Sequence, residues 1–220
     1  GYRAFHDPDA SAESEIARFI QHYSIKSEIV LSHIRKANRG RVCLENTHPF
    51  ARELWGQTWS FAHNGQLRGI KKRPLAHYCP VGATDSEYAF CWLLDQVRTA
   101  FPTRPRQPRV LWQLLAELCA DLASLGVFNL LLSDSSAFYA HCSTRLSWLT
   151  RRAPFGRATL IDADMAIDFA QHAGPDDVVT VVATAPLTRD EVWQPFHPGE
   201  FRVFRGGQSV ATMQHGRAAP

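Results

Sequence analysis

The 220-residue sequence lacks long apolar runs, internal repeats and low-complexity segments. No stretch approaches the roughly 20 consecutive apolar residues that a membrane-spanning helix needs, so no membrane partner is expected. The first residues also lack the pattern of a secretory signal peptide, which places an apolar run between a charged start and small residues. Because 45% of the residues are hydrophobic and 11% are aromatic, a disordered or fibrous chain is excluded. One globular domain over residues 1–220 is predicted.

Cysteine is sparse and follows no pairing pattern. The number of cysteines is odd and no two form a Cys-x-x-Cys motif; they are Cys43, Cys79, Cys91, Cys119 and Cys142. This spacing excludes the disulfide framework of small secreted proteins and favours the reducing cytoplasm. Cys91 and Cys119 lie in apolar helical contexts and are predicted to be core residues, whereas Cys43 is predicted to lie in a strand.

Lysine is also rare, since 20 of the 24 basic residues are arginines and the net charge is only +3. The densest basic cluster, residues 103–109, combines three arginines with two prolines and is predicted to be an exposed, extended loop. It contains none of the aromatic side chains that stack on bases in nucleic-acid-binding surfaces. No nucleic-acid partner is therefore expected.

Hydrophobic periodicity predicts strands on both sides of a helical pair. Helical spacing covers residues 13–23, 86–101 and 110–125, with Ser11 or Ser14 capping the first helix and Thr84 or Asp85 the second. β-like runs predict strands at 28–35, 58–63, 127–134, 137–143, 178–184, 201–205 and 208–214, the last two joined by a hairpin. This order favours an α+β fold with antiparallel sheets and segregated helices. Residues 215–220 are predicted to be a frayed tail.

Four short polar motifs carry the chemistry of the sequence. They are His33-Ile34-Arg35, Asn46-Thr47-His48-Pro49-Phe50, His63-Asn64-Gly65 and Thr84-Asp85-Ser86-Glu87. An arginine can hold a carboxylate through two hydrogen bonds, an aspartate can hold an ammonium group, and an Asn-Gly turn can offer two N–H groups to an oxyanion. Together they could bind glutamine. Taken singly, Asn-Gly is also typical of an ordinary sharp turn and Asp85 of a helix cap.

These motifs and their neighbours resemble the class II (N-terminal nucleophile) glutamine amidotransferase family. The resemblance covers residues 31–67 almost throughout, Thr-Asp-Ser-Glu at 84–87, and "ATAPLTRDEVWQPFHPGE" at 183–200. It implies a single glutamine amidotransferase type 2 domain with the four-layer αββα sandwich of N-terminal nucleophile (Ntn) hydrolases. It also implies ammonia release from glutamine through a cysteinyl thioester, without a cofactor or metal, and a separate enzyme as one candidate to accept the ammonia.

The resemblance also implies roles for individual residues. Asn64 and Gly65 correspond to the oxyanion hole of the family. Arg35 corresponds to the arginine that holds the substrate α-carboxylate, and Asp85 to the aspartate that holds the α-amino group. Two histidines, His48 and His63, are expected to flank the site and to bind or shape the glutamine pocket.

The nucleophile of the family is an N-terminal cysteine whose own α-amino group acts as the base, whereas this sequence begins with Gly1. A cysteine in mid-chain has no such amine and would need another base. We therefore expect several tens of residues, including the first strands and the nucleophile, to precede Gly1.

Three other functions stay open at this stage. The run "ATAPLTRDEVW" also resembles relatives that cleave a γ-glutamyl bond in a larger metabolite. A non-catalytic glutamine-binding domain would keep the two clamp residues but would not need the oxyanion pair. A metal hydrolase could use His33, His48 and His63 with Asp85, although their spacing matches no short zinc motif.

Overall fold

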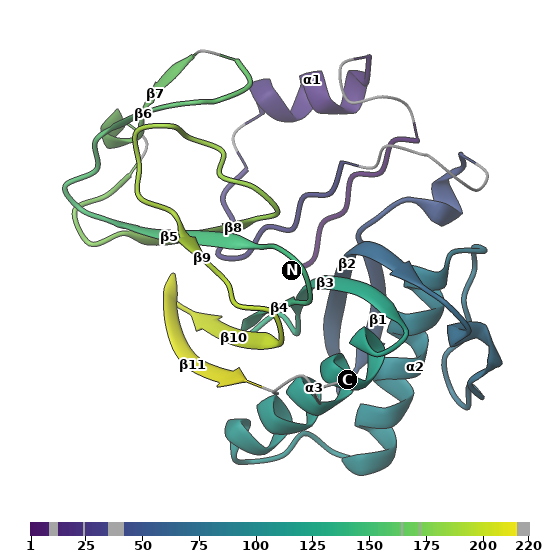
Figure 1. The fold of residues 1–220 in the computed structure, drawn as a ribbon. Helices are drawn as coiled ribbons and strands as arrows, with labels where there is room; N and C mark the ends of the chain where they lie inside the picture. The colour runs from purple at the N-terminus through teal and green to yellow at the C-terminus, as the bar shows by residue number, and fades with distance from the viewer. Residues whose placement is uncertain (9–12, 24, 35–41, 164, 172, 215–220) are drawn as a thin grey trace.

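The computed structural model describes residues 1–8, 13–23, 25–34, 42–163, 165–171 and 173–214. Its largest element is an antiparallel six-stranded sheet with the order β1-β2-β3-β4-β10-β11 (Figure 1). The strands are β1 (Phe50–Leu54), β2 (Gln57–Leu67), β3 (Gly126–Ser133), β4 (Phe138–Cys142), β10 (Glu200–Arg205) and β11 (Gln208–Gln214). The chain leaves this sheet after β4 and returns to it at β10.

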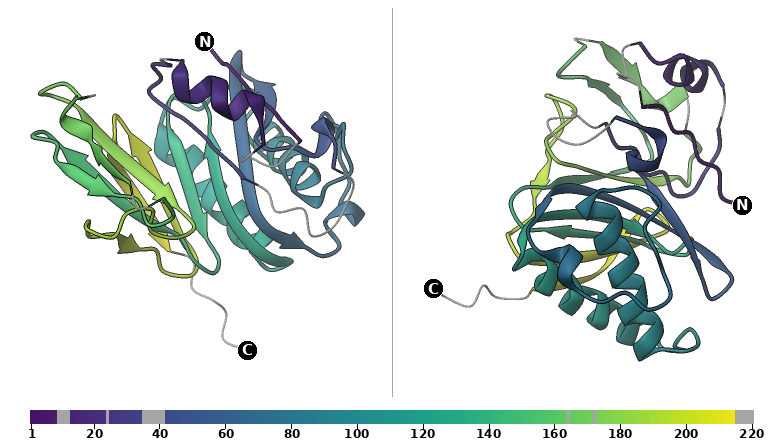
Figure 2. Two further views of the ribbon diagram at one scale, coloured as in Figure 1. Left: turned by 90° about the horizontal axis from the view of Figure 1, so that it is seen from above. Right: turned by 90° about the vertical axis from the view of Figure 1, so that its right-hand side faces the viewer.

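Two helices cover one face of the six-stranded sheet (Figures 1 and 2). α2 (Asp85–Ala100) packs on β1 and β2, and α3 (Pro108–Ala123) packs on β3, β10 and β11. The rings of Phe61 and Phe90 stack across this interface with their centroids 4.9 Å apart. Burying one large apolar side chain contributes about 1.5–3 kcal/mol. The larger cluster of buried apolar side chains lies between these helices and the sheet, so this layer is the main core. Cys91 and Cys119 are buried in it, as predicted.

A three-stranded antiparallel sheet with the order β8-β5-β9 lies beside β10 and β11 (Figure 2). Its strands are β5 (Ser147–Arg152), β8 (Val178–Ala183) and β9 (Gln194–Pro195). A short pair, β6 (Arg157–Thr159) and β7 (Ala166–Asp168), and the 3-10 turn η3 (Phe169–Gln171) extend this part outward. Thr180 donates its hydroxyl to the carbonyl of Gly207 over 2.6 Å, which ties β8 to the β10–β11 hairpin.

The N-terminal part, before β1, carries α1 (Glu15–His22) and the 3-10 turn η1 (Leu44–Asn46). A second 3-10 turn, η2 (Ile70–Lys72), lies between β2 and α2. Ser14 begins α1, because its Oγ accepts a hydrogen bond from the N–H of Ala17 at 2.9 Å. His6 Nε2 donates to the carbonyl of Pro49 at 2.9 Å and so joins this part to the residues just before β1. Within the described residues, no helix is both long and apolar enough to cross a bilayer.

The predicted buried strand at 28–35 is wrong for its described residues, 28–34, which belong to no strand. Val30 and Ile34 leave 71% and 75% of their surface exposed. A strand needs hydrogen bonds from a neighbour, and no described strand pairs with this segment. A β-branched apolar pattern is therefore not sufficient to form a strand in this segment.

The other predicted elements are present, apart from small shifts of their ends. Antiparallel sheets with few helices are confirmed, whereas the four-layer order stays a prediction, because the described chain shows one helical layer, α2 and α3, on the large sheet. Cys43 directly precedes η1 and is not in a strand. In the Pro/Arg loop, Arg104 reaches the buried Asp134 at 2.5 Å. The tail at 215–220 lies outside the described residues.

Candidate active site

Asn64 and Gly65 lie inside β2, opposite Asn129 and Phe128 of β3. The predicted sharp turn at this pair is wrong, since the strand continues to Leu67. Gly65 has a φ of 152°, and a Cβ there would lie 1.9 Å from the carbonyl oxygen of Val127. Glycine is therefore required by the close approach of β3. Both Asn64 and Gly65 remain exposed, so a ligand can reach the chain at this pair.

His63 is the buried residue immediately before this pair, with 2% of its surface exposed. Its Nε2 lies 3.0 Å from the carbonyl oxygen of Val127, which can only accept, so Nε2 carries the proton. Nδ1 then accepts from the hydroxyl of Ser86 at 2.8 Å. Burial lowers the pKa of His63, which keeps the ring neutral near pH 7. The ring of His63 thus joins β2 to α2 through Nδ1 and to β3 through Nε2.

Asp85 is the first residue of α2, behind the cap residue Thr84, whose Oγ1 accepts from the N–H of Glu87 at 3.1 Å. Of the two predicted caps, Thr84 is the one that the structure shows. Oδ2 of Asp85 accepts from the N–H of Leu67 at 2.7 Å, and the half-buried carboxylate keeps Oδ1 for a second donor. The positive end of the helix dipole favours a negative charge at this position.

The loop before α2 is shaped by the buried Glu87, which is 1% exposed. Its carboxylate accepts from the N–H groups of Val81 at 2.9 Å and Gly82 at 2.7 Å. Arg52 of β1 completes the cluster with a 2.6 Å ion pair. Three donors therefore fix the loop that leads into Asp85.

Asn46 connects the second motif to this loop. Its Oδ1 accepts from the N–H of Ala83 at 2.8 Å, and Asn46 itself is buried. The two segments approach so closely that a Cβ on Gly82 would lie 2.3 Å from the carbonyl oxygen of Glu45. The motif at 46–50 is thereby held against the motif at 84–87.

His48 and His33 join the first motif, at 33–35, to the second motif, at 46–50. Their rings stack with centroids 4.2 Å apart, and the ring of Phe50 lies 4.5 Å from that of His48. A cavity of about 180 Å³ opens beside the two histidines and is bounded on another side by α1. Contacts therefore join all four motifs in space. Arg35, the predicted carboxylate clamp, lies outside the described residues.

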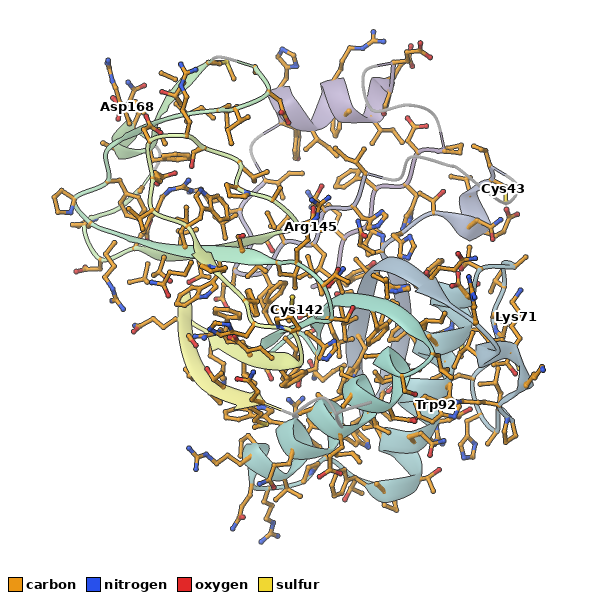
Figure 3. The ribbon with its side chains drawn as sticks, viewed as in Figure 1. Cys43, Lys71, Trp92, Cys142, Arg145 and Asp168 are labelled. Atoms are coloured by element: carbon orange, nitrogen blue, oxygen red, sulfur yellow. The ribbon has the colours of Figure 1, made fainter. Side chains whose placement is uncertain are left out.

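Asn129 is a buried polar residue that the sequence analysis missed, although a lone asparagine in the apolar run of β3 signals such a role. Its Oδ1 accepts from the N–H groups of Ser143 at 3.0 Å and Thr144 at 3.1 Å, and its Nδ2 donates to the hydroxyl of Thr144 at 2.8 Å. The turn after β4 is thus pinned beside the strand position opposite Asn64. Arg145, which follows this turn, lies near the centre of the view in Figure 3.

The histidines do not converge as a metal site. Among the described residues, no group of three or more His, Cys, Asp or Glu side chains is arranged to hold a metal ion. His63 in particular would have to give up its bond to Ser86 or Val127 to become a ligand.

The three buried cysteines are not poised as nucleophiles. Burial raises the pKa of the Cys91 and Cys142 thiols to about 11, and it raises that of Cys119 as well. A nucleophilic cysteine instead needs a lowered thiol pKa or an adjacent base. Cys79 is exposed, and Cys43 lies half-buried beside η1 (Figure 3).

Comparison with known proteins decides the family. The family model described as "Glutamine amidotransferases class-II" matches residues 1–219. The chain belongs to the class II glutamine amidotransferases. The resemblance read from the four motifs is therefore confirmed.

Relatives in this family align along most of the chain. The Escherichia coli protein named "Putative glutamine amidotransferase YafJ" is 53% identical over 210 residues, which cover 96% of this chain and 82% of the relative. A Haemophilus influenzae protein, also named a "Putative glutamine amidotransferase", is 42% identical over 213 residues, covering 97% of this chain and 72% of the relative.

Two solved structures share the fold of this chain. The crystal structure of a "predicted glutamine amidotransferase" from Pseudomonas aeruginosa matches with a TM-score of 0.73 and 51% identity, over 81% of this chain and 70% of that one. A class-II domain protein from Silicibacter pomeroyi matches with a TM-score of 0.61 over 98% of this chain and 86% of that one. At 20% identity the second match shows the fold alone.

Proposed function

We propose that this class II glutamine amidotransferase is an amidohydrolase that releases ammonia from glutamine through a cysteinyl thioester. The observation that carries the proposal is the joining of two motifs by two hydrogen bonds. His63 and Leu67 of β2, which flank Asn64 and Gly65, are held by Ser86 and Asp85 in the first turn of α2. These bonds support the proposal because they hold Asn64 and Gly65, the proposed oxyanion pair, close to Asp85, the proposed ligand of the substrate ammonium group.

In the proposed reaction, the thiolate attacks the side-chain amide carbon of glutamine. Negative charge develops on the amide oxygen, where the side-chain N–H of Asn64 and the backbone N–H of Gly65 stabilise it. The nitrogen takes a proton from the α-ammonium group of the nucleophilic cysteine and leaves as ammonia. Water then attacks the thioester, which yields glutamate and restores the thiol. The nucleophile is the N-terminal cysteine implied by the family resemblance and is not one of the five cysteines of this sequence.

Substrate binding is assigned to the ends of the amino acid. Asp85 would hold the α-ammonium group through Oδ1, and Arg35 would hold the α-carboxylate through its two-pronged guanidinium. His48 would form a wall of the pocket. His63 is better assigned as a positioning residue than as a contact, because both of its ring nitrogens already have partners in the protein.

The cavity beside His33 and His48 supports a second substrate class. Its volume of about 180 Å³ and its apolar boundary, which includes Ile16 and Ile20 of α1, would suit a group attached beyond the γ-amide. The enzyme would then also cleave γ-glutamyl amides larger than glutamine. Comparing turnover of glutamine with that of γ-glutamyl amides carrying progressively larger amines tests this extension.

The proposal is tested by ammonia release combined with labelling by 6-diazo-5-oxo-norleucine, a glutamine-like electrophile. We expect the intact protein to form equal amounts of ammonia and glutamate from glutamine, and to lose activity as one adduct forms. Mass spectrometry should map the adduct to a cysteine other than the five present here. Cys43→Ala is the matched control, because Cys43 lines the cavity beside His33 and His48. This variant should be labelled and inactivated as the unchanged protein is. No ammonia and no adduct, or an adduct on Cys43, would overturn the proposed chemistry.

A further inference from the structure

A second and larger cavity lies against β5, on the three-stranded sheet. It has a volume of about 570 Å³, within the range of sites that hold small metabolites. β5, the segment after it, the segment before β9 and the start of β11 form its walls, and it shares no lining residue with the cavity at His33 and His48. In Figure 3, Asp168 marks this part of the molecule and lies on the opposite side from Cys43.

One wall of this cavity is a closed polar network. Arg151 donates to Glu191 from both Nε and Nη2, each at 2.6 Å, and the hydroxyl of Thr188 donates to the same carboxylate at 2.6 Å. Trp193 Nε1 donates in turn to Thr188 at 3.0 Å. These bonds, led by Arg151, lower the pKa of Glu191. The carboxylate of Glu191 is thus fully engaged and is not directed at a ligand.

The remaining cationic side chains of the lining are neutralised only weakly. Arg152 is exposed and donates to the neutral amide oxygen of Gln208 at 2.9 Å. Arg157 is 76% exposed, and its ion pair with Asp168 spans 3.7 Å. Such an exposed pair contributes only about 0–1 kcal/mol, so an incoming anion can compete with it. The described lining therefore has two arginines that can turn toward an anion, and its carboxylate, Glu191, is already paired with Arg151.

Aromatic and polar groups complete the cavity. Trp148 and Phe155 line it beside the two arginines. The guanidinium of Arg202 in β10 lies over the indole ring of Trp148, 4.6 Å from the ring centroid, and holds the indole in place. Ser209 and Gln194 add neutral polar side chains. We infer that this cavity is a second ligand site, separate from the glutaminase site, for a small polyanion that carries phosphate or carboxylate groups.

Calorimetric titration of the intact protein tests this site, with inorganic pyrophosphate and citrate as probes in about 0.15 M salt. Binding of at least one probe with one site per chain is expected. Arg152→Gln and Arg157→Gln should each weaken binding about tenfold or more, because each removes one charged hydrogen-bond donor. The affinity of Arg152→Lys should fall between those of Arg152→Gln and the unchanged protein, since lysine keeps the positive charge but lacks the two-pronged guanidinium. Pyrophosphate binding alone would identify phosphate ligands, and citrate binding alone carboxylate ligands.

Arg106→Gln is the matched control, because it removes one exposed arginine from the Pro/Arg loop, outside the cavity. It should leave the affinity unchanged. Equal weakening by Arg106→Gln and Arg152→Gln would reduce the effect to net charge and overturn the site, as would failure of both probes to bind. The arginines are exposed, so thermal denaturation should be the same in all variants and folding does not obscure the result.

Discussion

Leu67 donates its backbone N–H to Oδ2 of Asp85 over 2.7 Å. This bond ties the end of β2 to the first residue of α2. A second tie, between His63 and Ser86, lies on the other side of Asn64 and Gly65. The exposed pair is therefore held at both ends by one helical turn. Substitutions in that turn should change the reaction rate or substrate affinity proposed for the pair.

Asp85→Asn should separate substrate binding from structure. The asparagine Oδ1 can still accept from Leu67, but the negative charge for the substrate ammonium group is lost. A hydrogen bond to a charged group contributes about 1.5–3 kcal/mol, so KM for glutamine should rise roughly tenfold to a hundredfold with little change in Tm. Asp85→Ala should raise KM and also lower Tm, because Leu67 loses its acceptor. An unchanged KM in Asp85→Asn would rule out the ammonium-binding role.

Asn64→Ala should lower kcat with little effect on KM. Removing one oxyanion donor typically costs about a hundredfold to a thousandfold in turnover. Gln66→Ala is the matched control, because Gln66 is also exposed and lies two residues further along β2. Steady-state glutamine hydrolysis gives both constants. If Gln66→Ala slowed turnover as much as Asn64→Ala, the oxyanion assignment would fail.

Stability should depend on pH through His63. The folded protein keeps this ring neutral because its pKa lies below the ordinary value of 6.5. Below about pH 6.5 the unfolded chain binds a proton that the folded chain does not, so stability is full above that pH and is lost as the pH falls. The slope contributed by one group is at most about 1.4 kcal/mol per pH unit.

Urea unfolding at pH 7.5, 6 and 5 measures this dependence. His63→Gln should be less stable at pH 7.5 but should lose less stability on acidification than the unchanged protein. His77→Gln, at an exposed histidine, is the control and should follow the unchanged protein. Identical slopes in all three proteins would show that His63 does not stay neutral on folding.

Glu87→Ala should be strongly destabilising, because it leaves the charge of Arg52 and two backbone N–H groups without their buried acceptor. Breaking a buried pair in this way costs about 3–5 kcal/mol. Asp121→Ala breaks the exposed ion pair with Arg73 and should cost no more than about 1 kcal/mol. Denaturant unfolding compares the two variants, and similar losses would contradict the organising role of Glu87.

Much of the fold could be predicted from the sequence, because α2, α3 and most strands bury one periodic apolar face. The failure at 28–34 has a physical cause: strand formation depends on a partner that local sequence does not specify. The Asn64-Gly65 turn was mispredicted for a related reason. Glycine there serves the close approach of Val127 in β3, which only the tertiary structure shows.

The candidate site was predicted as a set of motifs but not as a network. Asn64, Gly65 and Asp85 stood out because the family motifs contain them. The supporting contacts of Ser86, Asn46 and Asn129 depend on how separate segments pack, so no local pattern could pair them.

The most direct test of the central claim, that the four motifs form one amino-acid site, is an NMR titration of the ¹⁵N-labelled intact protein with L-glutamate, the expected product. The account predicts concentration-dependent shifts of the backbone amide signals of Asn64, Gly65, Leu67 and Asp85, and much smaller shifts with D-glutamate. Shifts confined to other segments, or no shifts at all, would contradict it.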